Sequence, residues 1–182
     1  ISISAALGEN KALAQINLNS DTATFDSMTS TGEILIETLT GNIIVPQSLT
    51  TSNNSANAIV INAGKNSNAG DASGGNIIIS GSPNLTVGNG GLIKLFTGGI
   101  SQSTGLVGYI GNSSGNFRYN SDEQITNYTL NLTPNVVSAI YREEVNLGVS
   151  LDDKIIVYGD SAPTFTTTVN GLTVEQRQAL TD

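Results

Sequence analysis

The sequence predicts an all-β protein in which short parallel strands stack into a three-sided parallel β-helix. Three observations support this prediction. Short aliphatic segments alternate with a period of two, the pattern of a strand with one buried face. Similar segments recur along the chain with turn residues between them. Gly, Ser, Thr and Asn also make up 81 of the 182 residues, a composition that favours turns over helix interiors.

The predicted strands follow from this alternation, taken in chain order. The chain opens with Ile1 and Ile3 separated by serine, and later segments repeat the pattern, as in Ile34 with Ile36 and Ile77 with Ile79. Their many β-branched residues also favour strands. The predicted strands are Ile1–Ser4, Gln15–Asn19, Glu33–Thr38, Asn42–Val45, Ala58–Asn62, Asn76–Ser80, Leu92–Phe96 and Leu106–Ile110.

The spacing of these strands suggests a repeat. Centres near residues 16, 34, 59, 77, 93 and 109 lie about 19 residues apart on average, which leaves room for three short strands and three turns at about 3.3 Å per strand residue. One such repeat cannot bury its apolar face alone, but stacked repeats can. We therefore expect one interior stack of Ile16, Ile34, Ile59, Ile77 and Ile93. A β-sandwich, whose strands also recur at short intervals, is the alternative.

Two shifts along the chain predict its organisation. Residues 1–108 contain two of the nine aromatic residues, and the net charge is −2 over residues 1–120 but −6 over residues 121–182. We therefore assign β-helix repeats to 1–120, a connecting segment or cap to 121–147, and the start of a further β module to 148–182. The small, polar stretch Gly64–Gly74 is expected to project as a loop that tolerates deletion.

Composition and charge exclude several functions. The chain lacks cysteine and histidine, which rules out disulfides, zinc–thiolate sites and histidine chemistry. The net charge of −8 disfavours nucleic acid and anionic lipid as partners. No apolar run approaches the roughly 18 residues of a membrane helix, so membrane insertion is not expected. The chain does not begin with methionine, and we interpret it as part of something longer.

The repeats resemble those of filamentous-haemagglutinin-like exoproteins, which bacteria export by two-partner secretion. The similar phrases are Gly32-Glu33-Ile34-Leu35-Ile36, Gly41-Asn42-Ile43-Ile44-Val45 and Ser73-Gly74-Gly75-Asn76-Ile77-Ile78-Ile79-Ser80. The resemblance covers roughly residues 1–120. It implies a right-handed parallel β-helix used as a long stalk, secreted or located at the bacterial cell surface.

The later part of the chain is similar to the start of an MBG or YDG module, a Gly-rich β module found in tandem in such exoproteins. The residues that carry this resemblance are Tyr141-Arg142-Glu143-Glu144, Leu151-Asp152-Asp153-Lys154 and Val157-Tyr158-Gly159-Asp160-Ser161-Ala162-Pro163-Thr164-Phe165. The match covers about 25 residues, short of a whole module.

Acidic residues offer little support for catalysis. The acids close together in the repeat region are Asp21, Asp26, Glu33 and Glu37. Glu33 and Glu37 would share one face of a strand, but at about 13 Å apart they exceed the separation of paired glycosidase carboxyls. We therefore expect no enzyme and no catalytic or cofactor-binding residue.

The sequence also offers candidate metal ligands and a candidate cross-linking lysine. Asp71 and the group Asp152, Asp153 and Asp160 are the candidate calcium ligands, but their spacing matches no known calcium loop, so no metal or cofactor is expected. Lysine-to-asparagine cross-links require a buried lysine. Alternation places Lys94 opposite Ile93 and Leu95, so we expect a surface lysine.

The sequence thus predicts a structural stalk fragment of a secreted bacterial adhesin that presents binding activity away from the cell. Its partners would be neighbouring repeats of the same chain, with host or surface glycans or proteins as candidates. The alternatives are a glycan- or host-binding module and a polysaccharide-active enzyme. A binding module would act through Ala63–Gly75 or the aromatic stretch Tyr109–Tyr128.

Overall fold

The computed structural model describes residues 1–112, 114–145, 148–159 and 161–170. The described chain is all-β with parallel sheets, apart from one five-residue helix and one antiparallel hairpin. Its elements are β1 (Ile16–Ser20), β2 (Ala23–Thr24), β3 (Met28–Ser30), β4 (Ile34–Thr38), β5 (Ile43–Val45), β6 (Leu49–Thr51), β7 (Ile59–Ala63), β8 (Ile77–Ile79), β9 (Leu85–Thr86), β10 (Ile93–Thr97), α1 (Leu106–Ile110), β11 (Phe117–Arg118), β12 (Val137–Tyr141), β13 (Gly148–Leu151) and β14 (Thr167–Asn170).

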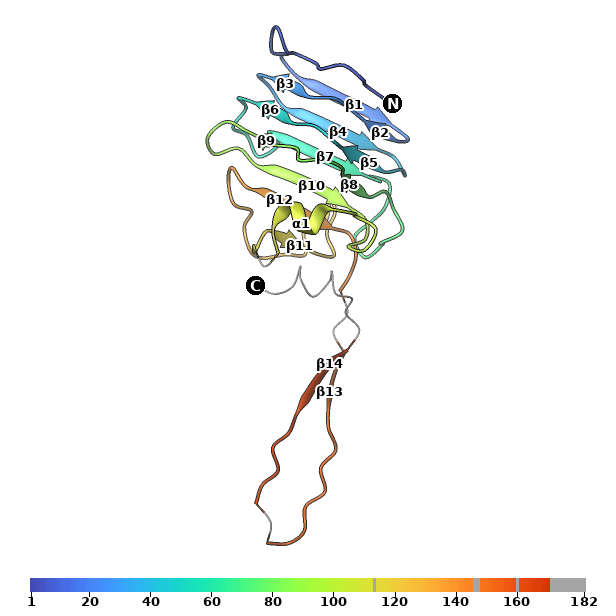
Figure 1. Ribbon diagram of the computed structural model, residues 1–182, viewed down its shortest axis with the longest axis vertical. Coiled ribbons are helices and arrows are strands. Elements are labelled where there is room, and N and C mark those ends of the chain that lie inside the picture. The colour runs from blue at the N-terminus through green and yellow to red at the C-terminus, as the bar shows by residue number, and fades with distance from the viewer. Residues whose placement is uncertain (113, 146–147, 160, 171–182) are drawn as a thin grey trace.

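Three parallel sheets form the body, and the chain visits them in turn. The first sheet has the order β1-β4-β7-β10-β12-β11, the second β2-β5-β8 and the third β3-β6-β9. From β1 to β9 each strand of the first sheet is followed by one strand of the second and one of the third, so the strands stack in layers (Figure 1). This arrangement is compatible with a parallel β-helix.

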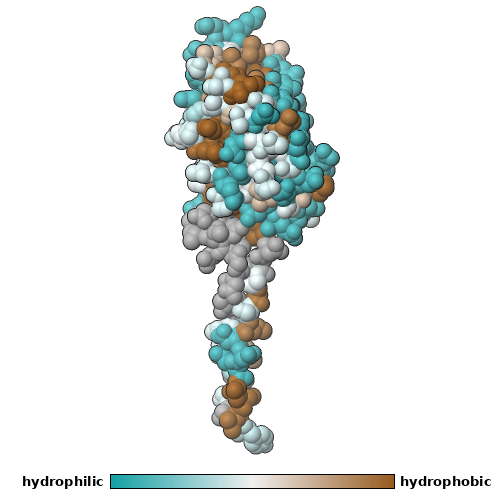
Figure 2. All heavy atoms as spheres, turned by 90° about the vertical axis from the view of Figure 1, so that its right-hand side faces the viewer, coloured by the Kyte–Doolittle hydropathy of each residue, from teal (hydrophilic) through white to brown (hydrophobic). Residues whose placement is uncertain are grey.

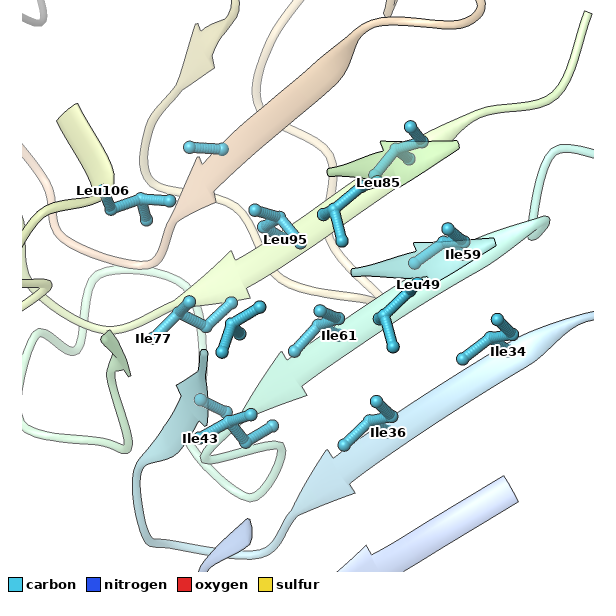
Figure 3. Packing of buried hydrophobic residues seen from close by; sticks show 14 of the residues in the cluster. Ile34, Ile36, Ile43, Leu49, Ile59, Ile61, Ile77, Leu85, Leu95 and Leu106 are labelled. Carbon is cyan, nitrogen blue, oxygen red and sulfur yellow. The ribbon is translucent and has the colours of Figure 1, made fainter. Parts of the chain in front are cut away.

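The three sheets share one hydrophobic core. Ile34 and Ile36 of the first sheet, Ile43 of the second and Leu49 of the third have no exposed surface and belong to one cluster. Their side chains converge in the space between the sheets (Figure 3). Burial alternates along β4, where every second residue is buried, because successive side chains of a strand point to opposite faces.

The predicted stack of isoleucines is right for four members and wrong for Ile77. Ile16, Ile34, Ile59 and Ile93 are register partners in the first sheet, but Ile77 pairs with Ile43 in the second. Ile77 is buried in the core nonetheless. The number of residues between neighbouring first-sheet partners grows along the chain, being smaller from Ile16 to Ile34 than from Ile59 to Ile93. A fixed spacing therefore assigned Ile77, which belongs to the second sheet, to the first.

Two other strand predictions differ from the structure. Leu106–Ile110 is helix α1, not a strand, and it packs against β8 and β12. Leu106 and Val107 are its buried residues. Ile1–Ser4 makes only an isolated parallel bridge from Ser2 to Thr24. Beside that bridge, the Ile3 amide donates to the Thr24 carbonyl and the Thr24 amide donates to the Ile1 carbonyl, so Ile1–Ser4 lies alongside β2.

The Gly64–Gly74 loop does not project freely, contrary to the prediction. The Gly70 amide donates a hydrogen bond to the Arg142 carbonyl at 2.7 Å, and the Ala69 amide donates to Asp122 Oδ2 at 2.7 Å. At its base, Gly75 lies so close to the Gly41 carbonyl oxygen that an added Cβ would come within 2.0 Å of it. These contacts tie the loop to the body, although residues 65–74 are half-buried or exposed, and the tolerance of the loop to deletion stays a prediction.

The segment after α1 continues the first sheet in an unexpected order. β12 lies between β10 and β11, and both pairings are parallel. Phe117 and Tyr119 stack on Tyr141, with ring centroids 6.4 and 5.7 Å apart. These aromatic side chains therefore pack at the end of the core that β11 and β12 close.

The hairpin β13–β14 stands apart from the stacked sheets (Figure 1). The arm, defined here as residues 148–170, has exposed apolar side chains at Val149, Leu151, Ile155, Ile156, Val157, Tyr158 and Phe165. Figure 2 shows brown apolar atoms along it. Within the described chain, no helix is long and apolar enough to cross a membrane.

Candidate functional site

The outer face of the first sheet carries the most developed surface site. Pairing of β4, β7 and β10 aligns Leu35, Val60 and Lys94 in one outward row, and all three are half-buried. Phe96 also points outward, yet it is only 6% exposed. With Glu123 from the segment after β11, these side chains enclose a hollow of about 200 Å³.

Lys94 is the central polar group of this hollow. Its Nζ donates a hydrogen bond to Asn57 Oδ1 at 2.6 Å. Burial lowers the pKa of Lys94, although the negative charge of Glu33 acts in the opposite direction. Glu33 is held in place by Ser55, whose hydroxyl donates to Glu33 Oε1 at 2.8 Å. Lys94 does point outward as predicted, but it is half-buried in a lined hollow and is not a fully exposed surface lysine.

A second, wider hollow of about 550 Å³ adjoins the first, and Lys94 lines both. Tyr128 and Asn131 form part of its wall. The Arg118 guanidinium lies over the Tyr128 ring at 5.6 Å and donates to the Leu130 and Asn131 carbonyls. These contacts fix the wall of the second hollow against β11.

A buried arginine joins three separate parts of the chain. The Arg142 side chain has no exposed surface, donates to the Ala63 carbonyl and to Asn62 Oδ1, and lies 3.5 Å from Glu123. Its Nε has no hydrogen-bond partner among the described residues. Burial lowers the pKa of Arg142, while Glu123 acts to raise it. Arg142 thereby ties β12 to β7 and to the segment after β11.

The predicted acid pair is separated by its own contacts. Glu37 lies in β4 and Glu33 directly precedes that strand. Glu33 accepts from Ser55, whereas Glu37 pairs with Lys65 at 2.8 Å. Asp26 Oδ1 accepts from the Ser27 amide. Among these described acids, the structure therefore brings no two carboxylates together at a common point.

The candidate calcium ligands do not come together. Asp71 accepts hydrogen bonds from the Ser73 amide and hydroxyl. Asp152 contacts Thr166 and lies 3.8 Å from Lys154, while Asp153 is exposed. Asp160 lies outside the described residues. Across the described chain, no group of three or more acidic, histidine or cysteine side chains could hold a metal ion.

Another surface is apolar. On the outer face of the second sheet, Ile44 and Ile78 are register partners, and with Ile1 they border a hollow of about 440 Å³. Ile44 is 37% exposed. Figure 2 looks at this side of the body and shows brown patches among hydrophilic atoms.

Asn57 and Arg142 are the residues that sequence reasoning missed. Asn57 is separated from Lys94 by 37 positions, and only the pairing of Ile59 with Ile93 brings them together. Arg142 stands in the sequence within the motif Tyr141-Arg142-Glu143-Glu144, and nothing in that motif indicates burial. No protein-family model matches the chain, and neither a curated protein nor a solved structure is detectably similar to it.

Proposed function

We propose that the chain is a segment of a right-handed parallel β-helix that acts as a rigid spacer in a secreted bacterial surface adhesin. Residues 148–182 would begin the next module of that protein, in line with their resemblance to an MBG or YDG module. The spacer would present binding activity away from the cell. The supporting observation is the order of the strands, which visit three parallel sheets in turn around one core.

The packing of the sheets suits this role. Parallel strands follow one another at about 4.8 Å in a sheet, so each added layer lengthens the body by a fixed amount while burying its own isoleucines. In a repeat architecture each layer contacts only its neighbours, so stacking similar layers builds a long, stiff rod. The secreted or surface location rests on the resemblance of the repeats to filamentous-haemagglutinin-like exoproteins.

Single-molecule force spectroscopy tests the spacer function. The chain is held by handles at residues 1 and 145 and pulled. We expect discrete force peaks as successive layers detach, because each layer is a cooperative packing unit. Smooth extension at low force would contradict the proposal. Antibody labelling of intact and of lysed cells that carry the gene tests the surface location independently.

We propose a structural role in preference to an enzymatic one. Glu33, Glu37 and Asp122 each have separate hydrogen-bond or ion-pair partners, and a glycosidase needs two carboxyls at a common point. A reducing-sugar assay on bacterial and host polysaccharides tests this view, and release of reducing ends by the purified chain would overturn it.

A binding module is the second candidate, and the hollow beside Tyr128 favours it. That hollow combines an aromatic ring, the Asn131 amide and the Lys94 ammonium group, which is a mixture suited to a sugar ring. A glycan array with the wild-type chain and with Tyr128→Ala distinguishes the two candidates. Binding that the substitution abolishes would favour the module.

A further inference from the structure

Beyond the spacer role, we propose that Lys94 and Asn57 join through an intramolecular amide bond, with Glu33 as the proton carrier. The amide would connect β10 to the turn before β7, which belong to adjacent layers of the first sheet. The inference does not depend on where the protein is located or on what it binds. It rests on the arrangement of three side chains in one partly enclosed hollow.

The two side chains are already in hydrogen-bond contact. Lys94 Nζ lies 2.6 Å from Asn57 Oδ1, an atom of the same amide group whose carbon it would attack. The parallel pairing of β7 with β10, with Ile59 opposite Ile93, fixes the two backbones. Reactive groups held at contact distance react far faster than the same groups free in solution.

The surroundings favour the reactive form of the amine. Leu35, Val60 and Phe96 line the hollow around Lys94, and this burial lowers the pKa of its amine. A neutral amine is the nucleophile, as in other buried lysines that react with carbonyl groups. Glu33 faces the same hollow, and the Ser55 hydroxyl orients its carboxylate.

The chemistry balances without a further reactant. Glu33 accepts one proton from the Lys94 ammonium group, and the freed electron pair on Nζ attacks Asn57 Cγ. The new Nζ–Cγ bond forms, the Cγ–Nδ2 bond breaks, and Nδ2 takes up two protons, one from Glu33 and one from Nζ. The products are a secondary amide and one ammonium ion, and no atom is oxidised or reduced.

Intact-mass spectrometry followed by tryptic mapping tests the inference on the purified full chain. We expect the mass to fall short of the sequence mass by one ammonia molecule. Because trypsin does not cut after an acylated lysine, residues 66–118 should remain whole and should be joined to residues 12–65. Peptides that end at Lys94 and are not joined to residues 12–65 would overturn the inference.

Matched variants distinguish the Lys94–Asn57 amide bond from other reactions that release ammonia. Asn89-Gly90 can lose ammonia by closing on its own backbone, so mass alone does not suffice. In Lys94→Met and in Asn57→Ala the joined peptides should disappear. Glu37→Gln breaks the neighbouring Lys65–Glu37 pair but keeps the tryptic site after Lys65, so it should leave the joined peptides intact. Glu33→Gln should slow their appearance after refolding. Residues 12–65 that remain joined to residues 66–118 in Lys94→Met would overturn the assignment.

Discussion

Ile77 and Ile78 are neighbours in β8 with opposite surroundings. Ile77 has no exposed surface, while Ile78 lies on the half-exposed outer face. We expect Ile77→Ala to lower the free energy of unfolding by about 2–5 kcal/mol, because it leaves a cavity in the core. Ile78→Ala should cost less than about 1 kcal/mol. Urea unfolding curves measure both, and equal losses would mean that the register of the second sheet is wrong.

Arg142 shows how a single polar residue can stabilise an apolar body. Replacing it with methionine removes the donor to Asn62 and leaves Glu123 without its cation. We expect a loss of about 1–3 kcal/mol, because the buried Ala63 carbonyl and Asn62 Oδ1 lose their charged donor.

The matched control for Arg142 is Lys65→Met, which breaks a partly exposed pair with Glu37. Such pairs contribute at most about 1 kcal/mol. Thermal unfolding of both variants gives the comparison. If Lys65→Met proved as damaging as Arg142→Met, the buried position of Arg142 would not be the source of the stability.

At the scale of an element, the turn after β11 is stabilised by one carboxylate. Asp122 accepts hydrogen bonds from the amides of Gln124, Ile125 and Ala69. Burial acts to raise the pKa of Asp122, but these bonds and the charge of Arg142 outweigh it and hold the pKa below its ordinary value of 3.8. The carboxylate thereby fastens the Gly64–Gly74 loop to the turn.

This lowered pKa predicts a stability that depends on pH. A carboxyl with a lower pKa in the folded state contributes fully above its unfolded pKa, and that contribution is lost as the pH falls through the folded pKa. We expect the melting temperature to drop below about pH 4, and Asp122→Asn to flatten that part of the curve. Asp153→Asn, at an exposed position, is the control, and it should leave the drop in melting temperature at low pH unchanged.

Helix α1 shows how tertiary context decides an element. Leu106, Val107 and Ile110 suit either a strand or one face of a short helix, and periodicity alone does not separate the two in so short an apolar run. The helix places Leu106 and Val107 in the core beside β8 and β12. Burial against those strands outweighs the intrinsic preference of its glycine and valine residues for other conformations.

At the scale of the whole molecule, β12 closes an edge that would otherwise be open. It pairs with β10 on one side and β11 on the other. A chain of residues 1–120 therefore exposes the β10 edge and leaves Phe117 without Tyr141. Since an open strand edge is a template for pairing with other chains, we expect this shortened chain to self-associate more than residues 1–145.

Light scattering over a range of concentrations measures the difference between the two shortened chains. Residues 1–145 retain β12 and the Arg142 contacts, so they should behave like the full chain. Equal association of 1–120 and 1–145 would show that closing the β10 edge has no influence on the solution state.

The sequence alone determined the class of this protein. Alternating isoleucines and abundant turn residues predicted an all-β chain with parallel strands, and the predicted strands at Gln15–Asn19, Glu33–Thr38 and Ala58–Asn62 overlap β1, β4 and β7. Four of the five isoleucines of the expected stack pair in one sheet. These features were readable because strand alternation is local, with a period of two residues.

Tertiary structure alone decided which sheet each strand joins and where polar residues meet. Ile77 and Ile93 look alike in sequence, but the length of chain before each one sends them to different sheets. Asn57 meets Lys94, and Arg142 meets Asn62, across separations of 37 and 80 residues. Such contacts depend on how many residues each turn holds, and local side-chain patterns do not encode that length because loops can lengthen at little cost in free energy.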